Sequence, residues 1–209
     1  RSDSSAASDV YKRQALDLIV QAIEKSKLKP GNDVVICLDV AANELMNEKG
    51  EYSVQSSNFL PVDEVVNYYK KLTSSYPIKS IEDPFAEEDW QSWKKICSAI
   101  GNNVQIVGDD LFVTNSKRLE KGINEKTANS ILVKPNQIGT LTETLEVISI
   151  AKKANFSTII SHRSGDTEDT FIADLAVATM SSQIKTGSLA RSERVAKYNS
   201  CLLYTSDAA

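Results

Sequence analysis

The stretch Val34-Val35-Ile36-Cys37-Leu38 ends in Asp39, and it is the first of six short apolar runs that each stop at an acid, a lysine or a histidine. The other five runs end in Glu82, Asp109, Lys134, His162 and Lys185. From Glu82 onward the steps between these terminal residues are 27, 25, 28 and 23, about the length of one strand plus one helix. The period therefore predicts parallel strands with a polar residue at each C-terminal end, which is the layout of a barrel enzyme's active site.

The segments between these runs have helical periodicity, with apolar residues recurring at three- and four-residue spacing. The pattern predicts helices over residues 15–27, 61–75, 89–100, 116–126, 140–154 and 171–180. Alternating strands and helices indicate a parallel sheet with right-handed crossovers. An open doubly wound sheet is the alternative, but it needs a Gly-rich phosphate turn or a switch-point crevice, and the chain has no GxGxxG. We therefore expect an α/β fold, a partial TIM-type (β/α) barrel with about six of its eight parallel strands.

The composition is that of an ordinary folded protein, and it narrows the function classes. The chain has 209 residues, 41% of them hydrophobic and 25% charged, which is enough for one domain with a sizeable core. A net charge of −4 argues against a general nucleic-acid binder, which needs a basic stripe. The apolar runs are too short for a membrane span, and we find no secretory signal. The three cysteines form no CxxC pair, which fits a reducing cytoplasm.

The two ends of the chain resemble translated adapter DNA. The bases GAT GTG TAT AAG AGA CAG encode Asp9–Gln14, and their reverse complement, read from its second base, encodes Cys201–Ser206. Inverted flanks of this kind look like a transposon-end adapter from a sequencing library. We therefore expect residues 1–14 to be an adapter-derived, disordered artefact. We expect residues 201–209 to be an adapter-derived artefact as well. Residues 15–200 are then a barrel domain truncated at both ends, with two strands missing before residue 15.

Three of the strand-end residues are carboxylates: Asp39, Glu82 and Asp109. Taken singly, each is more simply explained as a helix cap or as the partner of a surface lysine. Three converging carboxylates would repel one another without a cation, and Mg²⁺ prefers oxygen ligands of this kind. All three at matched positions therefore predict a metal site.

The remaining strand ends carry Lys134, Lys185 and His162, the chain's single histidine. Two lysines beside a metal-bound anion indicate charge complementarity, and a lysine crowded by cations can act as a base. His162 is followed by Arg163 and Ser164, whose donors suit phosphate oxygens, and the next helix presents its positive N-terminal end. A charged loop with an internal Arg–Asp pair is the alternative for this segment. Further along, residues 191–194 are interpreted as a surface ion-pair cluster.

Long motifs throughout residues 15–199 resemble the enolase family. They are LDVAANE (38–44), SIEDPFAEEDW (80–90), VGDDLFVTN (107–115), LVKPNQIGTLTET (132–144), SHRSGDTEDTFIADLAV (161–177) and QIKTGSLARSERVAKYN (183–199). The resemblance implies the C-terminal barrel of an enzyme that interconverts 2-phosphoglycerate and phosphoenolpyruvate with Mg²⁺, in glycolysis and gluconeogenesis. It also implies a homo-oligomeric parent and a cytoplasmic location, although family members also occur at the cell surface or secreted.

The resemblance assigns roles residue by residue. Asp39, Glu82 and Asp109 match the Mg²⁺ carboxylates, Glu82 and Asp109 also lining the substrate site, and Lys134 matches the base that removes the C2 proton. Lys185 matches the second active-site lysine, on the substrate carboxylate. His162, Arg163 and Ser164 match the substrate-binding loop, with Arg163 and Ser164 on the phosphate.

The family's N-terminal domain and its first two barrel strands, which carry the catalytic acid, have no counterpart in this sequence, so we expect the fragment alone to be inactive. Two other functions stay open. One is a different Mg²⁺-dependent lyase or isomerase of the enolase superfamily, against which the phosphate loop argues. The other is a non-catalytic binding role.

Overall fold

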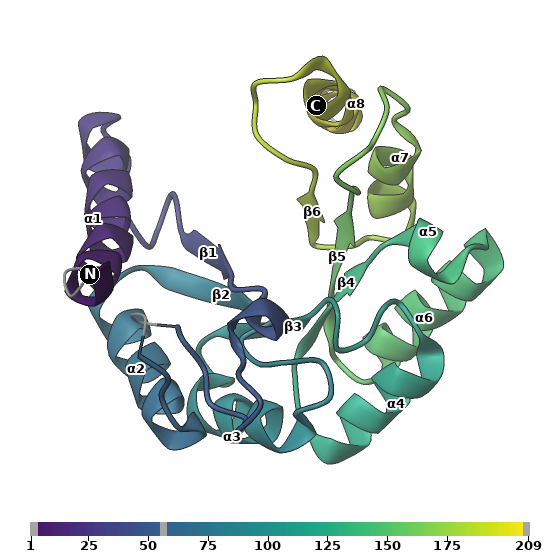
Figure 1. Ribbon diagram of the computed structural model, residues 1–209. Helices are drawn as coiled ribbons and strands as arrows, with labels where there is room; N and C mark the ends of the chain where they lie inside the picture. Colours follow the sequence, from purple (N-terminus) through teal and green to yellow (C-terminus); the bar gives the residue numbers. More distant parts are fainter. Residues whose placement is uncertain (1–3, 55–57, 207–209) are drawn as a thin grey trace. The chain divides into compact units, whose positions relative to one another are not determined.

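The computed structural model describes residues 4–54 and 58–206, which form two compact units (Figure 1). Unit 1 holds the described residues up to Val107 together with Lys126–Ala128. Unit 2 holds Gly108–Glu125 and the described residues from Asn129 onward. Each unit alternates strands with helices, as the period of the apolar runs predicts.

Unit 1 is built on three parallel strands. They are β1 (Ile36–Asp39), β2 (Ile78–Glu82) and β3 (Gln105–Gly108), whose last residue belongs to unit 2. β2 pairs with both neighbours, with Asp39 opposite Glu82 and Glu82 opposite Val107. Four of the five residues of β2 are buried, as expected for a parallel strand covered on both faces.

The helices of unit 1 begin where the sequence supplies capping and charge. α2 (Val62–Ser75) starts after Pro61 with two acids in its first turn, which favours a helix N-terminus. α3 (Trp90–Ile100) is capped by Asp89, whose carboxylate accepts the Ser92 N–H at 3.2 Å. The short 3₁₀ helix η1 (Ala42–Leu45) follows β1.

An aromatic cluster forms the centre of unit 1. The Tyr52 and Phe85 rings meet edge to face at 5.1 Å, and Tyr69 meets Phe85 in the same way at 6.2 Å. The buried Tyr52 hydroxyl donates to Asp89 at 2.8 Å, so its polar end is satisfied. Trp93 is also buried and donates its indole N–H to the Ala86 carbonyl at 3.0 Å.

The first helix corrects an expectation. α1 (Ser4–Lys25) runs through residues 4–14, where we expected disorder; residues 1–3 lie outside the described residues. Residues 4–14 contain no Gly or Pro, and extending an existing helix adds one backbone hydrogen bond per residue. Of the apolar stripe predicted on this helix, Leu16 and Ile23 are buried, whereas Ile19 is exposed.

Unit 2 contains the other three parallel strands. β5 (Ser157–Ser161) pairs with β4 (Ser130–Val133) on one side and with β6 (Gln183–Lys185) on the other. All four residues of β4 are buried. The helices are α4 (Ser116–Glu125), α5 (Pro135–Ile138), α6 (Leu141–Lys153), α7 (Phe171–Ala178) and α8 (Ser192–Ser206).

α6 shows why the periodic segments were predictable. Thr140 caps it by accepting the Glu143 N–H at 3.2 Å, and Lys152 and Lys153 stand in its last turn, where cations are favoured. By contrast, α5 and α8 were not predicted. α8 continues past residue 200 through Cys201–Ser206, and residues 207–209 lie outside the described residues. Of the helices in the described residues, none is long and apolar enough to cross a membrane.

Candidate active site

Two of the predicted carboxylates lie side by side in unit 1. Asp39 and Glu82 are the last residues of β1 and β2 and stand opposite each other in the strand register. Backbone bonds continue past both strands, from Val40 N–H to the Glu82 carbonyl at 3.0 Å and from Asp83 N–H to the Val107 carbonyl at 3.0 Å. Glu82 is only 6% exposed, whereas Asp39 is exposed. The ladder thus fixes the backbone that carries this pair of oxygen donors.

The third carboxylate, Asp109, belongs to unit 2 and follows β3 directly. Its side chain forms an ion pair with Lys134, the residue directly after β4. Both side chains are largely buried, so the pair is shielded from water more than a surface pair would be. Gln137 Nε2 lies 3.5 Å from the second Asp109 oxygen. The structure therefore brings together a predicted metal ligand and the predicted base.

A strained turn after Asp109 holds this arrangement. Val113 and Thr114 both have positive φ values, of 42° and 54°, which are rare for β-branched residues and cluster at functional sites. The buried Thr114 hydroxyl accepts the Lys134 backbone N–H at 2.9 Å and donates to Gln137 Oε1 at 3.0 Å. Sequence reasoning missed Thr114 and Gln137, because neither residue ends an apolar run.

A glycine allows the turn to pack against the strand. A Cβ at Gly108 would lie 2.5 Å from the Phe112 ring, closer than real Cβ atoms approach other groups. The Phe112 and Val113 N–H groups both donate to the Asp109 carbonyl, at 3.2 and 2.8 Å. Gly108 is therefore needed for the tight chain reversal that presents Asp109.

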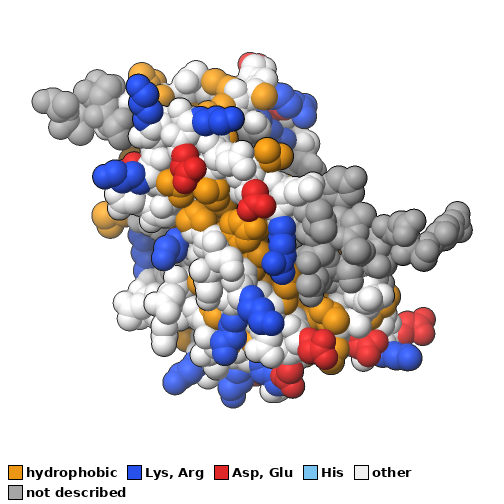
Figure 2. Space-filling model, turned by 90° about the vertical axis from the view of Figure 1, so that its left-hand side faces the viewer, with side chains coloured by type: hydrophobic (Ala, Val, Ile, Leu, Met, Phe, Trp, Pro, Cys, Tyr) orange, Lys and Arg blue, Asp and Glu red, His pale blue; other side chains and the backbone are white. Residues whose placement is uncertain are grey.

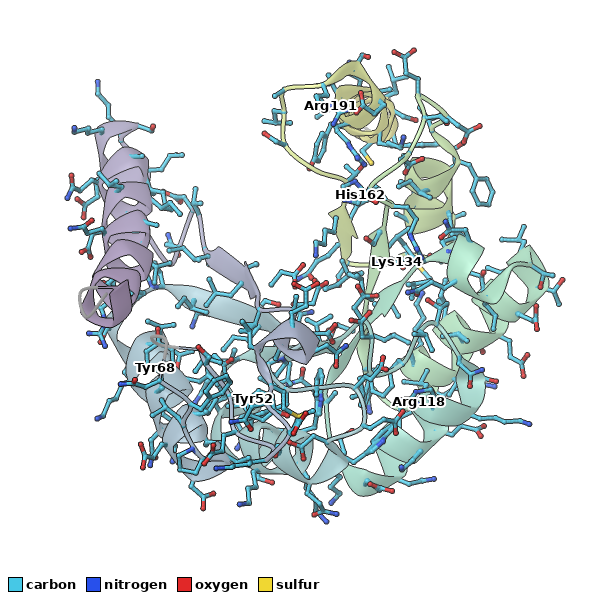
Figure 3. The ribbon with its side chains drawn as sticks, in the orientation of Figure 1. Tyr52, Tyr68, Arg118, Lys134, His162 and Arg191 are labelled. Atoms are coloured by element: carbon cyan, nitrogen blue, oxygen red, sulfur yellow. The ribbon has the colours of Figure 1, made fainter. Side chains whose placement is uncertain are left out.

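His162 and Lys185 lie at the ends of β5 and β6. The strand register sets Ser161 opposite Lys185, and the His162 backbone N–H donates to the Lys185 carbonyl at 3.0 Å. Figure 3 shows Lys134 and His162 at the ends of β4 and β5, which pair as neighbouring strands. A cavity of about 260 Å³ beside His162 is lined by Arg163, Asp166 and Phe171 among others. It has room for a small polar ligand.

The surroundings of His162 lower its pKa below the ordinary value. Burial is the largest cause, and the positive charges of Arg194 and Lys185 act in the same direction. Asp166 and a backbone hydrogen bond with Thr186 oppose them. The neutral ring is therefore the favoured form.

The segment after His162 differs in part from the expectation. Arg163 and Ser164 are exposed, and Asp166 lies 3.6 Å from Lys197 Nζ, so Asp166 faces a lysine on α8. The first N–H of α7, that of Phe171, donates to Asp169 Oδ1 at 2.8 Å. The positive end of that helix, predicted to attract phosphate, is thus already capped by a carboxylate.

The interpretation of residues 191–194 as a surface cluster is wrong for Arg194. Arg191 and Glu193 do form an ion pair, at 2.6 Å. Arg194, however, is buried and donates to the carbonyls of Arg163 and Ser164 at 3.0 and 2.9 Å. These backbone acceptors satisfy the buried guanidinium. In the sequence, the one signal for this role is the spacing of Arg194 and Lys197. Residues three apart share one face of a helix, so both could contact the same loop.

Comparisons with known proteins agree with this layout. The family model "Enolase, C-terminal TIM barrel domain" matches residues 4–207. The enolase of Pelagibacter ubique (strain HTCC1062) is 64% identical over 189 residues, which cover 90% of this chain and 45% of that protein. The enolase of Tropheryma whipplei (strain Twist) is 54% identical over 190 residues, covering 91% of this chain and 44% of that protein. With the parallel strands of each unit, the match confirms the predicted TIM-type barrel fold, and the chain spans under half the length of these relatives.

Proposed function

Because the chain belongs to the enolase family, we propose that the complete protein reversibly dehydrates 2-phosphoglycerate to phosphoenolpyruvate. The observation that carries this proposal is the contact between Asp109 and Lys134, which joins a candidate metal ligand to a candidate base. The relatives support the reaction class by name. We further propose a cytoplasmic location and a homo-oligomeric parent, as the resemblance implies.

The chemistry begins with loss of the proton at C2. Removing a proton beside a carboxylate builds a dianionic enediolate, whose charge must be stabilised as it develops. Enolase-superfamily sites in general use a lysine or histidine base with one or two Mg²⁺ ions, and that known pattern supports assigning the base to Lys134. The Lys134 backbone N–H donates to the Thr114 hydroxyl at 2.9 Å, and this bond fixes the backbone from which the Lys134 side chain extends.

We propose Mg²⁺ as the cofactor, with Asp39, Glu82 and Asp109 as its ligands. The donor set fits: all three are carboxylates at or directly after strand ends, and carboxylate oxygens are ligands that Mg²⁺ prefers. Two things support this assignment: the position of each carboxylate at the end of its own strand, and the family pattern. When bound, the ion would stabilise the negative charge of the enediolate.

We assign the remaining side chains to the substrate's anionic groups. Lys185 is proposed to bind the carboxylate, and Arg163 and Ser164 the phosphate, with His162 beside them. The cavity next to His162 supports this assignment, as does the exposure of Arg163, which leaves its planar fork accessible to a phosphate.

A chimera tests the proposed function in a complete protein. Residues 15–199 would replace the matching segment of the Pelagibacter ubique enolase, and phosphoenolpyruvate formation would be followed by its absorbance with Mg²⁺ present. We expect turnover that stops when the metal is chelated. A control chimera with Lys95→Met, which removes an exposed ion pair between α3 and α2, should keep full activity. A folded chimera that forms no phosphoenolpyruvate would contradict the proposal.

A further inference from the structure

α8 buries two cations on one face. Arg194 is 7% exposed and Lys197 is fully buried, and the two residues are three apart, so their side chains emerge on the same side of the helix. A buried charge requires hydrogen-bonding partners. For both residues these partners lie mainly in residues 162–167, on backbone carbonyls and on the side chains of His162 and Asp166.

Arg194 contacts three consecutive residues of this segment. Its Nη1 atom contacts His162 Nδ1 and donates to the Arg163 carbonyl at 3.0 Å, and its Nη2 donates to the Ser164 carbonyl at 2.9 Å. A guanidinium group has donors only, so His162 Nδ1 must accept. A ring that accepts at Nδ1 is neutral and carries its proton on Nε2.

A glycine makes this contact possible. Gly187 has a φ of +93°, and a Cβ there would lie 2.9 Å from Arg194 Cδ and 3.1 Å from His162 Cε1. The absence of a side chain at Gly187 therefore leaves room for Arg194 to pack against the imidazole ring.

The other charged groups that face His162 are consistent with a neutral ring. Lys185 on β6 and Arg194 on α8 disfavour the imidazolium form, whereas Asp166 in the loop and the Thr186 backbone favour it. With burial added, the balance lowers the pKa of His162.

Lys197 fixes the far end of the same segment. Its Nζ atom donates to the Thr167 carbonyl, and to the Glu193 carbonyl at 2.8 Å, and lies 3.6 Å from Asp166 Oδ1. The two cations of α8 thus hold residues 163–167 at both ends.

We propose that Arg194 is a positioning residue that holds His162 as the neutral Nε2–H tautomer and fixes the backbone of Arg163 and Ser164 beside it. His162 then offers one ring donor and no positive charge. The value of this arrangement for substrate binding rests on the function proposed above, but the tautomer itself does not.

The single histidine makes the test direct. In the ¹⁵N-labelled 209-residue chain, long-range ¹H–¹⁵N correlation spectra report both ring nitrogens of His162 without assignment ambiguity. At neutral pH we expect an unprotonated Nδ1, a protonated Nε2 and a titration below the ordinary pKa of 6.5. A proton on Nδ1, a fast mixture of tautomers or a charged ring would each overturn the proposal, and none of these results depends on a variant that must fold.

Variants separate positioning from packing. Arg194→Met keeps the aliphatic bulk and removes the donors, so Nδ1 should lose its fixed acceptor role and the pKa of His162 should rise. Arg194→Lys restores one donor and should recover the wild-type tautomer. Arg191→Met changes an exposed arginine directly before α8 and should leave the spectra unchanged. A His162 tautomer and pKa identical in wild type and Arg194→Met would overturn the proposal.

Failure of this inference is distinguishable from failure of the proposed function. The spectra need no substrate and no turnover, so a chimera without activity would leave the expected tautomer untouched. Conversely, an active chimera whose His162 carries its proton on Nδ1 would refute the proposed role of Arg194 and leave the proposed function intact.

Discussion

The carboxylate that follows β3 and the ammonium that follows β4 form an ion pair, Asp109 with Lys134. Gln137 lies against the second oxygen of the same carboxylate. A candidate metal ligand and a candidate base are therefore in contact, so substitution of one is expected to change the surroundings of the other.

Asp109→Asn should weaken metal binding in the chimera. The amide keeps the shape of the side chain but removes its charge, which a divalent cation requires. We expect the Mg²⁺ concentration for half-maximal turnover to rise by more than about tenfold. Asp63→Asn, at an exposed acid of α2, is the matched control and should leave the metal dependence unchanged. Equal Mg²⁺ dependence in both variants would remove Asp109 from the ligand set.

Stability should fall in mild acid because of His162. Its pKa is lowered in the folded chain, so above pH 6.5 the ring is neutral in both states and its contribution is complete. As the pH drops below 6.5, the unfolded chain binds a proton that the folded chain resists, and stability is lost. The urea midpoint should therefore decrease between about pH 7.5 and about pH 5.5. The decrease should be smaller in His162→Gln; an equal decrease would show that other groups cause it.

Gly108→Ala should destabilise the chain. The added methyl group would overlap the Phe112 ring at 2.5 Å, and both groups are buried, so the turn that carries Asp109 must shift. We expect a loss of about 1–3 kcal/mol in the free energy of unfolding, measured by urea denaturation. Gly165→Ala meets no atom within 4 Å and should change stability by less than about 0.5 kcal/mol. Similar losses in both variants would contradict this account of Gly108.

The 209-residue chain by itself should not form phosphoenolpyruvate. It spans under half the length of its enolase relatives, so we expect the site to be incomplete in this polypeptide. Turnover close to that of a complete enolase would refute this prediction.

The chain by itself should also self-associate. Hydrophobic side chains are visible at the surface in Figure 2, and Leu18, Met180 and Leu189 are exposed, which favours self-association. Sedimentation should show species larger than a monomer. A purely monomeric chain would contradict this expectation.

The periodic helices were predictable because their buried faces are apolar. The predicted bounds of α2, α3 and α6 agree with the structure to within one residue at each end, since each has an apolar stripe and a favourable start. α8 was missed because two of its buried side chains are Arg194 and Lys197. Sequence patterns score these residues as solvent-exposed, and only their bonds to backbone carbonyls make burial favourable.

The strand-end residues were predictable for a similar reason, because each follows a short apolar run. Their supporting contacts were not. The positive φ of Thr114 and the position of Gln137 depend on how a turn folds back on its strand. The capping of α7 by Asp169 was likewise not predictable from the sequence, because the carboxylate of a loop residue can face in several directions.

The most direct test of the central claim is exchange of the C2 proton. The chimera would be incubated with 2-phosphoglycerate and Mg²⁺ in D₂O, and deuterium at C2 would be followed by NMR. If Lys134 is the base, the chimera incorporates deuterium and Lys134→Met slows incorporation by about 10²–10⁴-fold. Incorporation at an unchanged rate in Lys134→Met would contradict the account.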